Sequence, residues 1–253
     1  MNKPTRLWIF TIFPDYFIPL VNYGVAGSAL RGERGFPFEI NIINLKDYSP
    51  FKYKNVDDSS FGGGPGMVIR ADILKNALNS VIESGHYTNL KEQLHVVYTS
   101  PRGKKWSNEL ARNYGIDYFA NKRKDLLFIC GRYEGIDERF CELYVDEEIS
   151  IGDFVLTGGE LAVMMMIDSA LRFIPGTLGN SESADQESFE NSLLDHPHYT
   201  KPAIFEDRLV PEVLLSGHHK NIEKFRLEEK IRLTKAYRPD LYDLFLNKQG
   251  KKK

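Results

Sequence analysis

Apolar and polar residues alternate in short runs along residues 7–151, and segments with a helical period lie between these runs. The runs predict five short strands, several of them buried on both faces, at residues 7–13, 38–45, 94–99, 126–130 and 145–151. The intervening segments predict helices at residues 15–30, 71–84, 106–114 and 137–144. Because strands and helices alternate, we expect an α/β fold with a mainly parallel sheet and helices on both faces.

A longer helix is predicted to begin at Thr157 and to run to about Phe173. Thr157 and Glu160 have the Ser/Thr-x-x-Glu spacing of a capping box, in which the two side chains bond free backbone N–H groups. The segment is apolar on all sides. We therefore expect this helix to be buried, either in the core or at a contact between subunits.

The chain changes character after Pro175 and Gly176. Residues 177–191 are rich in Ser, Gly, Asn and acidic residues and contain no Lys or Arg, which is typical of a linker. Beyond the linker, residues 210–246 predict two or three short helices. We expect an α/β domain at residues 1–175, an interdomain linker at 176–192 and a small α-helical domain at 193–253.

The composition is that of a soluble globular protein, with 42% apolar and 27% charged residues. The longest apolar run, residues 161–167, is far shorter than the roughly 20 residues of a membrane-spanning helix. The apolar start ends at Pro14 after one strand length, which favours a buried strand over a signal peptide. Cys130 and Cys141 lack the spacing of a zinc site or a disulfide framework. We expect a cytoplasmic protein without membrane contact.

The small net charge of −2 hides a strong asymmetry. Residues 216–253 carry 11 basic and 5 acidic side chains, a balance of +6, whereas residues 1–215 have a balance of −8. A basic segment on an acidic body is expected where one part of a protein binds a polyanion such as nucleic acid. The alternative is a solubilising tail at residues 251–253, but a balance of +3 remains without it.

Three glycine-bearing segments are candidates for ligand contact. Residues 57–66 contain four glycines in five positions, which suits either a structural turn or a binding loop. Residues 130–139 and 150–160 lie where predicted strands end and helices begin, as does the turn at 100–103. Since the carboxyl ends of parallel strands meet at one edge of a sheet, these turns predict a pocket lined by backbone groups.

Two further patterns leave alternatives open. Asp168 and Arg172 are four residues apart, so they form either a surface ion pair or a site in which Arg172 stabilises negative charge. His196 and His198 could bind a metal, but no Cys or carboxylate completes a standard ligand set. A structural or RNA-contacting role for these histidines is favoured.

Seven collinear segments resemble the bacterial tRNA (guanine-N1-)-methyltransferase family, the TrmD type within the SPOUT class. They cover nearly the whole chain, at residues 10–17, 62–66, 131–139, 151–161, 172–176, 197–202 and 213–217. The resemblance implies a deep trefoil knot in the α/β domain and a homodimer that holds tRNA across both subunits. It also implies methyl transfer from S-adenosylmethionine to N1 of the guanosine immediately 3′ of the anticodon, position 37, where the preceding base is guanine.

The resemblance assigns residues to the methyl-donor pocket, and one of them departs from the common pattern. Phe154 stands where many relatives have Tyr, so an aromatic wall is kept and a hydroxyl is lost. The full donor set is Pro101, Gly131, Tyr133, Glu134, Ile151, Gly152, Phe154, Leu156, Gly158 and Gly159.

The resemblance also implies two catalytic residues. Arg172 matches the family arginine that stabilises charge on guanine O6. The family's general base is an aspartate of the other subunit, but Glu187 stands at that position here, with Asp185 as a reserve. The extra methylene changes the reach of the carboxylate, which matters because general-base catalysis depends on hydrogen-bond distance.

One property is expected from the family alone, and other functions remain as alternatives. Magnesium is expected from the family, although no residue pattern in this sequence demonstrates it. The main alternative function is a noncatalytic tRNA-binding protein that retains the fold. A dinucleotide-dependent oxidoreductase lacks its glycine fingerprint here, and a methyltransferase acting on another RNA or base is the nearest enzymatic alternative.

Overall fold

The computed structural model describes residues 4–177 and 187–250 and divides the chain into two compact units. The first unit comprises Met1–Gly179 and the second Asn180–Lys253. The boundary between them falls inside the segment predicted as a linker.

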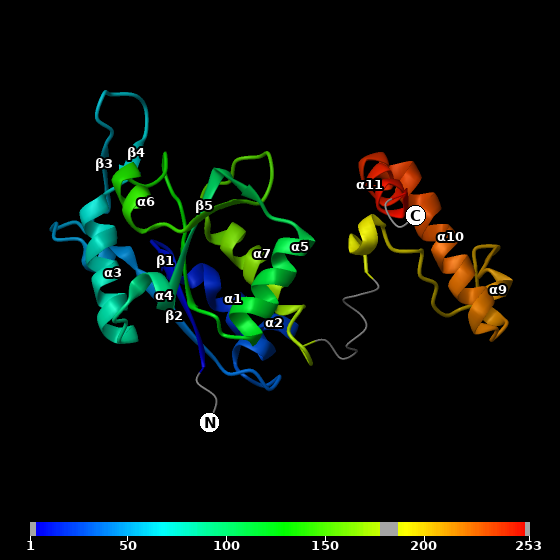
Figure 1. The fold of residues 1–253 in the computed structure, drawn as a ribbon. Coiled ribbons are helices and arrows are strands. Elements are labelled where there is room, and N and C mark those ends of the chain that lie inside the picture. Colours follow the sequence, from blue (N-terminus) through cyan, green and yellow to red (C-terminus); the bar gives the residue numbers. More distant parts are fainter. Residues whose placement is uncertain (1–3, 178–186, 251–253) are drawn as a thin grey trace. The chain divides into compact units, whose positions relative to one another are not determined.

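A five-stranded sheet forms the centre of the first unit (Figure 1). Its strands run in the order β2-β1-β6-β5-β7, and every neighbouring pair is parallel. The prediction of a mainly parallel α/β fold is therefore confirmed. The strands are β1 (Thr5–Thr11), β2 (Phe38–Asn44), β5 (Leu94–Lys105), β6 (Asp125–Ile129) and β7 (Glu147–Ser150).

The sheet is covered on both faces because successive side chains of its central strands point to opposite sides. In β6, Leu126 and Phe128 belong to one buried cluster, and Leu127 and Ile129 belong to the other. The first face carries α1 (Ile18–Asn22), α2 (Gly24–Leu30), α5 (Asn108–Asn113), the π-helical segment η3 (Tyr114–Ala120) and α7 (Glu160–Leu171). The second carries η2 (Leu45–Tyr48), α3 (Ala71–Gly85), α4 (Leu90–Gln93) and α6 (Glu138–Tyr144).

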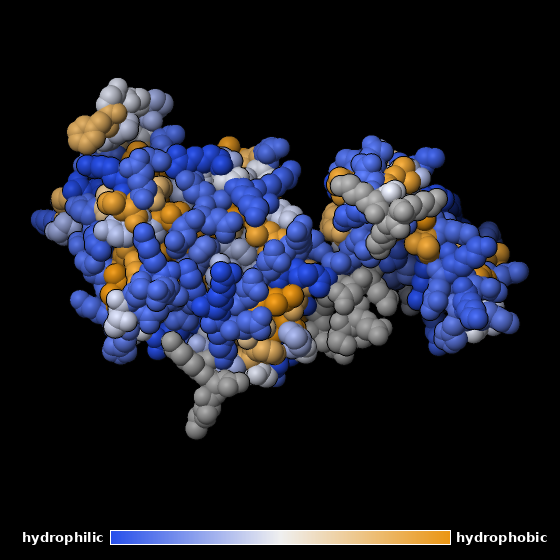
Figure 2. Space-filling model, in the orientation of Figure 1, coloured by the Kyte–Doolittle hydropathy of each residue, from blue (hydrophilic) through white to orange (hydrophobic). Residues whose placement is uncertain are grey.

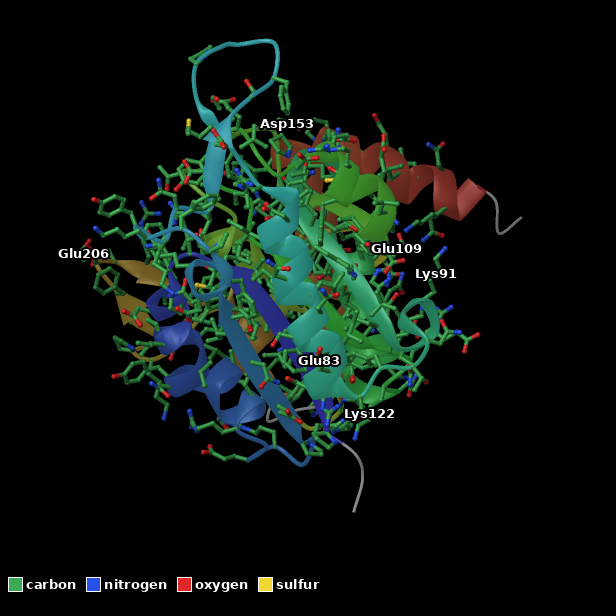
Figure 3. All side chains as sticks on the ribbon, turned by 90° about the vertical axis from the view of Figure 1, so that its left-hand side faces the viewer. Glu83, Lys91, Glu109, Lys122, Asp153 and Glu206 are labelled. Carbon is green, nitrogen blue, oxygen red and sulfur yellow. The ribbon has the colours of Figure 1, made fainter. Side chains whose placement is uncertain are left out.

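Polar side chains cover most of the visible face of the first unit (Figure 2). Charged residues such as Glu83 of α3, Lys91 of α4 and Glu109 of α5 point away from the sheet (Figure 3). None of the helices in residues 4–177 and 187–250 is both long enough and apolar enough to cross a membrane. Cys130 and Cys141 are free thiols, and both are buried.

Two predicted helices differ from the observed elements. The helix predicted at residues 15–30 is divided into η1 (Pro14–Phe17), α1 and α2, because Tyr23 adopts an extended backbone with φ −124° and ψ 155°. The helix predicted to begin at Thr157 begins at Glu160 instead, and its N-cap, Gly159, makes no side-chain capping bond. The capping box is wrong because the Glu160 carboxylate accepts hydrogen bonds from Thr11 and Arg132.

A short antiparallel hairpin was not predicted from the sequence. It consists of β3 (Asp57–Ser59) and β4 (Met67–Ile69), which pair with Asp58 opposite Val68. Strands of three residues are too short to give a clear alternation of apolar and polar positions. The glycine-rich residues 62–66 connect the two strands, so this motif forms the turn of a hairpin.

The second unit is mainly helical, as predicted. It contains η4 (Glu190–Ser192), the small hairpin of β8 (Ile204–Phe205) and β9 (Arg208–Leu209), and the helices α9 (Glu212–Leu215), α10 (His219–Tyr237) and α11 (Pro239–Gly250). Thr234 of α10 is fully buried. Its hydroxyl accepts a hydrogen bond from the backbone N–H of Leu194 at 2.8 Å, which fixes the segment after η4 on the long helix.

Trp8, Tyr87 and Asp125 form a buried hydrogen-bonded chain beneath the second face of the sheet. The indole N–H of Trp8 donates to Tyr87 Oη at 2.9 Å, and that hydroxyl donates to Asp125 Oδ2 at 2.6 Å. Burial first, and the Asp125 carboxylate second, raise the pKa of Tyr87 well above its ordinary value. The hydroxyl therefore keeps its proton and remains the donor to Asp125.

We expect Tyr87→Phe to lower the free energy of unfolding by about 1–3 kcal/mol, because it leaves the Trp8 N–H and an Asp125 oxygen buried without their partner. Both tryptophans of the chain, Trp8 and Trp106, lie in the first unit, so tryptophan fluorescence during urea unfolding reports its stability. Tyr53→Phe is the control, since Tyr53 is 79% exposed. An equal loss of unfolding free energy in the two variants would show that the hydrogen bonds of Tyr87 do not stabilise the first unit.

Candidate active site

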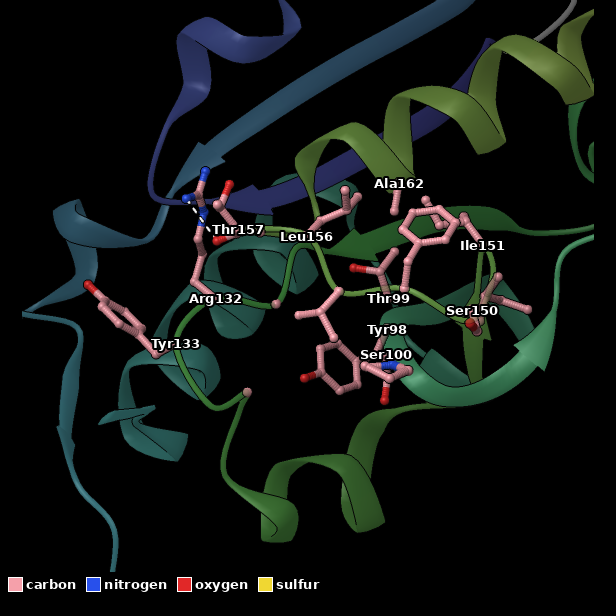
Figure 4. A pocket seen from close by; sticks show the side chains of 18 of the residues that line it. Tyr98, Thr99, Ser100, Arg132, Tyr133, Ser150, Ile151, Leu156, Thr157 and Ala162 are labelled. Carbon is pink, nitrogen blue, oxygen red and sulfur yellow. Dashed lines mark hydrogen bonds between the residues drawn. The ribbon is translucent and has the colours of Figure 1, made fainter. Parts of the chain in front are cut away.

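A cavity of about 310 Å³ lies at the carboxyl ends of β5, β6 and β7 (Figure 4). Its walls come from residues 98–101 of β5, residues 131–135 after β6 and residues from 149 to 159 around and after the end of β7. Ligands of open α/β sheets bind at this edge because the carboxyl ends of parallel strands meet there. The predicted turns therefore meet in one cavity.

All ten residues that the resemblance assigns to the donor pocket line this cavity. The cavity is also lined by Tyr98, Thr99 and Arg132, which the sequence did not predict as site residues. Arg132 nevertheless lies within the glycine-bearing segment 130–139. The ten are Pro101, Gly131, Tyr133, Glu134, Ile151, Gly152, Phe154, Leu156, Gly158 and Gly159.

Two of the cavity's walls are joined where Gly159 passes Gly131. The N–H of Gly159 donates to the carbonyl oxygen of Gly131 at 2.8 Å. A Cβ atom on Gly159 would lie 2.7 Å from the backbone nitrogen of Gly131 and 2.9 Å from Cα of Cys130. Only glycine allows this approach, because these two of the three nearest atoms belong to the backbone and cannot rotate away, and the third is the hydroxyl oxygen of Thr99.

A bulge in β5 brings a third wall to the cavity. The pairing of β5 with β7 shifts register between Thr99 and Lys104, so the residues between them leave the ladder. Arg102 holds this bulge in place: its guanidinium donates to Glu148 at 2.7 Å and to Glu138 at 2.8 Å. Pro101 consequently lies at the cavity wall, one residue before the arginine that fixes the bulge.

The loop after β6 is held in a strained conformation. Tyr133 has a φ of 59°, in the left-handed region that non-glycine residues rarely adopt. The backbone N–H of Glu134 donates to Met67 of β4 at 2.9 Å, and a Cβ atom on Gly66 would lie 2.5 Å from Cγ of Glu134. The β3–β4 hairpin therefore supports the loop from outside.

The glycine-rich turn of that hairpin does not line the cavity. Gly62, Gly63 and Gly64 all have positive φ and have no heavy atom within 4 Å of an added Cβ, and Phe61 is fully exposed. Of the two interpretations of this motif, the structure favours a structural turn over a loop of this pocket.

Arg172 and Glu187 lie outside the residues that line the cavity. Arg172 is the half-buried C-cap of α7 in the first unit, one turn after the exposed Asp168. Glu187 belongs to the second unit, where its carbonyl oxygen accepts from the N–H of Glu190 at 3.4 Å. Asp185, the reserve base, lies outside the described residues.

The histidines of the second unit do have a nearby carboxylate, contrary to the sequence reading. Ligand atoms of Asp195, His196 and His198 lie within 4.8 Å of one another. Asp195 is already bonded to other groups: Oδ2 is 2.9 Å from His198 Nε2, and Oδ1 is 3.1 Å from the ammonium of Lys230. The Lys230 charge opposes a cation there, so the cluster is better explained as an anchor on α10.

Comparison with known proteins identifies the family. A family model described as tRNA (Guanine-1)-methyltransferase TrmD matches residues 5–244. Relatives named tRNA (guanine-N(1)-)-methyltransferase are 46% identical over 244 residues in Hahella chejuensis and 44% identical over 248 residues in Clostridium tetani. These alignments cover 94% and 98% of this chain, and 88% and 96% of the relatives. The chain belongs to this family. Members of the tRNA (guanine-1)-methyltransferase family are enzymes, so the cavity belongs to a transferase.

We expect Gly159→Ala to destabilise the first unit by about 1–3 kcal/mol, because its methyl group overlaps backbone atoms of Gly131 and Cys130. Tryptophan fluorescence during urea unfolding measures the change. Asn79→Ala is the control in the same unit, since Asn79 is an exposed residue of α3. If Gly159→Ala unfolds at the same urea concentration as the wild type, the segments of Gly159 and Gly131 are farther apart than described.

Proposed function

We propose that this chain transfers the methyl group of S-adenosylmethionine to N1 of the guanosine at position 37 of tRNA, immediately 3′ of the anticodon, where the preceding base is guanine. The observation that carries the proposal is the family match, which extends over residues 5–244 and so includes both compact units. The relatives' names state guanine N1 of tRNA as their target. The cavity supplies a site of suitable size for the donor.

The residues of the cavity fit the donor that we propose. A volume of about 310 Å³ lies at the lower end of the range for small-molecule pockets, roughly 300–1,000 Å³. The ten residues named above would hold it, with Phe154 as an aromatic wall and the Glu134 carboxylate as an acceptor for ribose hydroxyls. When bound, S-adenosylmethionine supplies a methyl group attached to a positively charged sulfur.

In the proposed mechanism, Glu187 and Arg172 act on the guanine. Glu187 would accept the proton of N1, which leaves the N1 electron pair free to bond to the methyl carbon. The bond from that carbon to the donor's sulfur would break at the same time, and its electron pair would stay on sulfur. Negative charge then spreads onto O6, where the Arg172 guanidinium stabilises it as a fixed positive charge. A general base of this kind contributes about 10²–10⁴ in rate, provided that its oxygen reaches hydrogen-bond distance of N1.

We further propose a homodimer, in which Glu187 of one subunit serves the site of the other. Two exposed apolar side chains on α7 support a subunit contact: Leu161 is 46% and Met165 is 53% exposed, although most of the helix is buried. Val25, 45% exposed, lies on α2, which packs against α7. Apolar side chains exposed together on one face are typical of an interaction surface.

The second unit is our candidate for holding tRNA. Its long helix α10 carries six basic side chains, and the charge balance of residues 216–253 is +6. Lysine and arginine bind phosphate groups and release counterions, so binding to tRNA should weaken strongly with salt. We therefore assign donor binding to residues 1–175, the interdomain linker to 176–192 and tRNA binding to 193–253, in a cytoplasmic enzyme.

The family resemblance also implies a trefoil knot and magnesium, and both stay proposals. The trefoil knot rests on the family match over residues 5–244. Magnesium prefers several oxygen ligands. Glu134 is the one acidic side chain among the cavity's lining residues, so the cavity offers one carboxylate, and water or substrate oxygens would supply the other ligands of a magnesium ion. The mechanism contains no metal step.

The first test is methyl transfer from labelled S-adenosylmethionine to two tRNA transcripts that differ only at position 37. We expect label in the guanine transcript and none in the adenine transcript. Glu187→Gln should lower kcat by about 10²–10⁴, because the amide cannot accept the proton. Arg172→Ala should lower kcat while donor binding stays nearly unchanged, since the arginine acts on O6 and lies outside the cavity.

Other outcomes would redirect the proposal. Binding of tRNA without any transfer by the wild type would favour the noncatalytic alternative. Full activity of Glu187→Gln would remove Glu187 as the base, and Asp185 would be tested next. Loss of donor binding in Arg172→Ala, equal to its loss of turnover, would remove the role assigned to Arg172.

A mixing experiment tests the shared site. Arg172→Ala and Glu187→Gln are each expected to be nearly inactive alone. After denaturation and refolding of an equal mixture, half of the dimers contain one of each chain, and one of their two sites has both residues intact. Activity should then return to about a quarter of the wild-type level. If no activity returns, both residues of a site come from the same subunit.

A further inference from the structure

Arg132, which lines the cavity, forms an ion pair with the buried carboxylate of Glu160, and the roles proposed above do not explain this pair. Glu160, the first residue of α7, is 1% exposed and does not line the cavity. Its carboxylate accepts from Arg132 Nε at 3.0 Å, is 3.0 Å from Arg132 Nη2, and accepts from Thr11 Oγ1 at 2.8 Å. Three segments that are distant in the sequence therefore meet at this one carboxylate.

The Arg132 guanidinium is held on every side. Its Nη1 donates to the carbonyl oxygen of Thr157 at 3.1 Å, at one end of the cavity in Figure 4. The ring centroids of Phe13 and Tyr16 lie 4.5 Å and 5.6 Å from its Cζ, at cation–π distance. With both donor edges committed to Glu160 and Thr157, this arginine is suited to hold protein segments together.

The Arg132–Glu160 ion pair also lies directly against Gly158 of the cavity wall. A Cβ atom on Gly158 would lie 2.5 Å from Arg132 Cζ and 2.5 Å from Glu160 Oε2. Gly158 and Gly159 line the cavity, and Gly159 bonds to Gly131, the residue before Arg132. The ion pair and the Gly131–Gly159 hydrogen bond thus join the same two segments.

We propose that Glu160 is a positioning residue for methyl-donor binding, which acts through Arg132 to hold residues 156–159 at a fixed distance from residues 131–135. This inference rests on the proposed function, because it takes the cavity as the donor site. A carboxylate with several charge-assisted bonds in a buried site is geometrically restrictive. The cavity is therefore formed before the donor enters, and the donor need not order its walls.

The test compares donor binding by the full-length wild type, Glu160→Gln and the control Glu33→Gln. Glu33 forms an exposed ion pair with Arg31, so the same chemical change is made away from the cavity. We expect Glu160→Gln to raise both the dissociation constant of S-adenosylmethionine and the donor KM by about 10- to 100-fold. The KM for tRNA should change less than about twofold, and Glu33→Gln should match the wild type.

The readouts separate positioning from a structural role and from failure of the proposed function. Measurements are made at a temperature where circular dichroism shows each variant to be folded. An unchanged donor constant in folded Glu160→Gln, with wild-type binding intact, would overturn the inference and leave the proposed function standing. A wild type that binds no S-adenosylmethionine would overturn both.

Thr11→Val keeps the inference falsifiable if Glu160→Gln does not fold, and a double-mutant cycle with Arg132→Lys tests it further if Glu160→Gln folds. Thr11→Val removes one bond to the carboxylate, and we expect the donor constant to rise about threefold. In an Arg132→Lys background, Glu160→Gln should add less than about twofold, because the glutamate acts through the guanidinium. No change in Thr11→Val, or full additivity with Arg132→Lys, would contradict the inference.

Discussion

The proposed site depends on one close backbone contact, between the N–H of Gly159 and the carbonyl oxygen of Gly131 at 2.8 Å. This contact joins the segment after β7 to the loop after β6 and leaves no room for a side chain between them. These two segments form two walls of the cavity, and the bulge in β5 supplies the third. A parallel sheet makes this arrangement available by bringing three carboxyl ends to one edge.

The proposed binding and catalytic residues are distributed unevenly over the chain. The cavity is lined largely by backbone groups and by apolar or aromatic side chains, with Glu134 as its one acidic lining residue. The proposed base, Glu187, lies in the second unit, and Arg172 caps the last turn of α7 in the first. Such a division makes turnover depend on bringing together groups that are positioned separately, so geometry should contribute more than any single side chain.

The sequence predicts the sheet and the shared cavity well, because buried parallel strands and glycine turns leave strong local patterns. It fails where distant residues decide a local structure. Thr157 and Glu160 have the spacing of a capping box. Glu160 bonds instead to Arg132, 28 positions away, and to Thr11, 149 positions away, and no local pattern contains such contacts. The break at Tyr23 and the three-residue strands β3 and β4 are likewise set by tertiary packing or are too short to show a period.

The most direct test of the account is a crystal structure of the chain with S-adenosylmethionine or its demethylated product bound. The account predicts ligand density between residues 98–101, 131–135 and 149–159, with the adenosine or the sulfur in contact with the backbone near Gly131 and Gly159. Density at another site, with this cavity empty in a protein that methylates tRNA, would contradict the assignment of the cavity to the methyl donor.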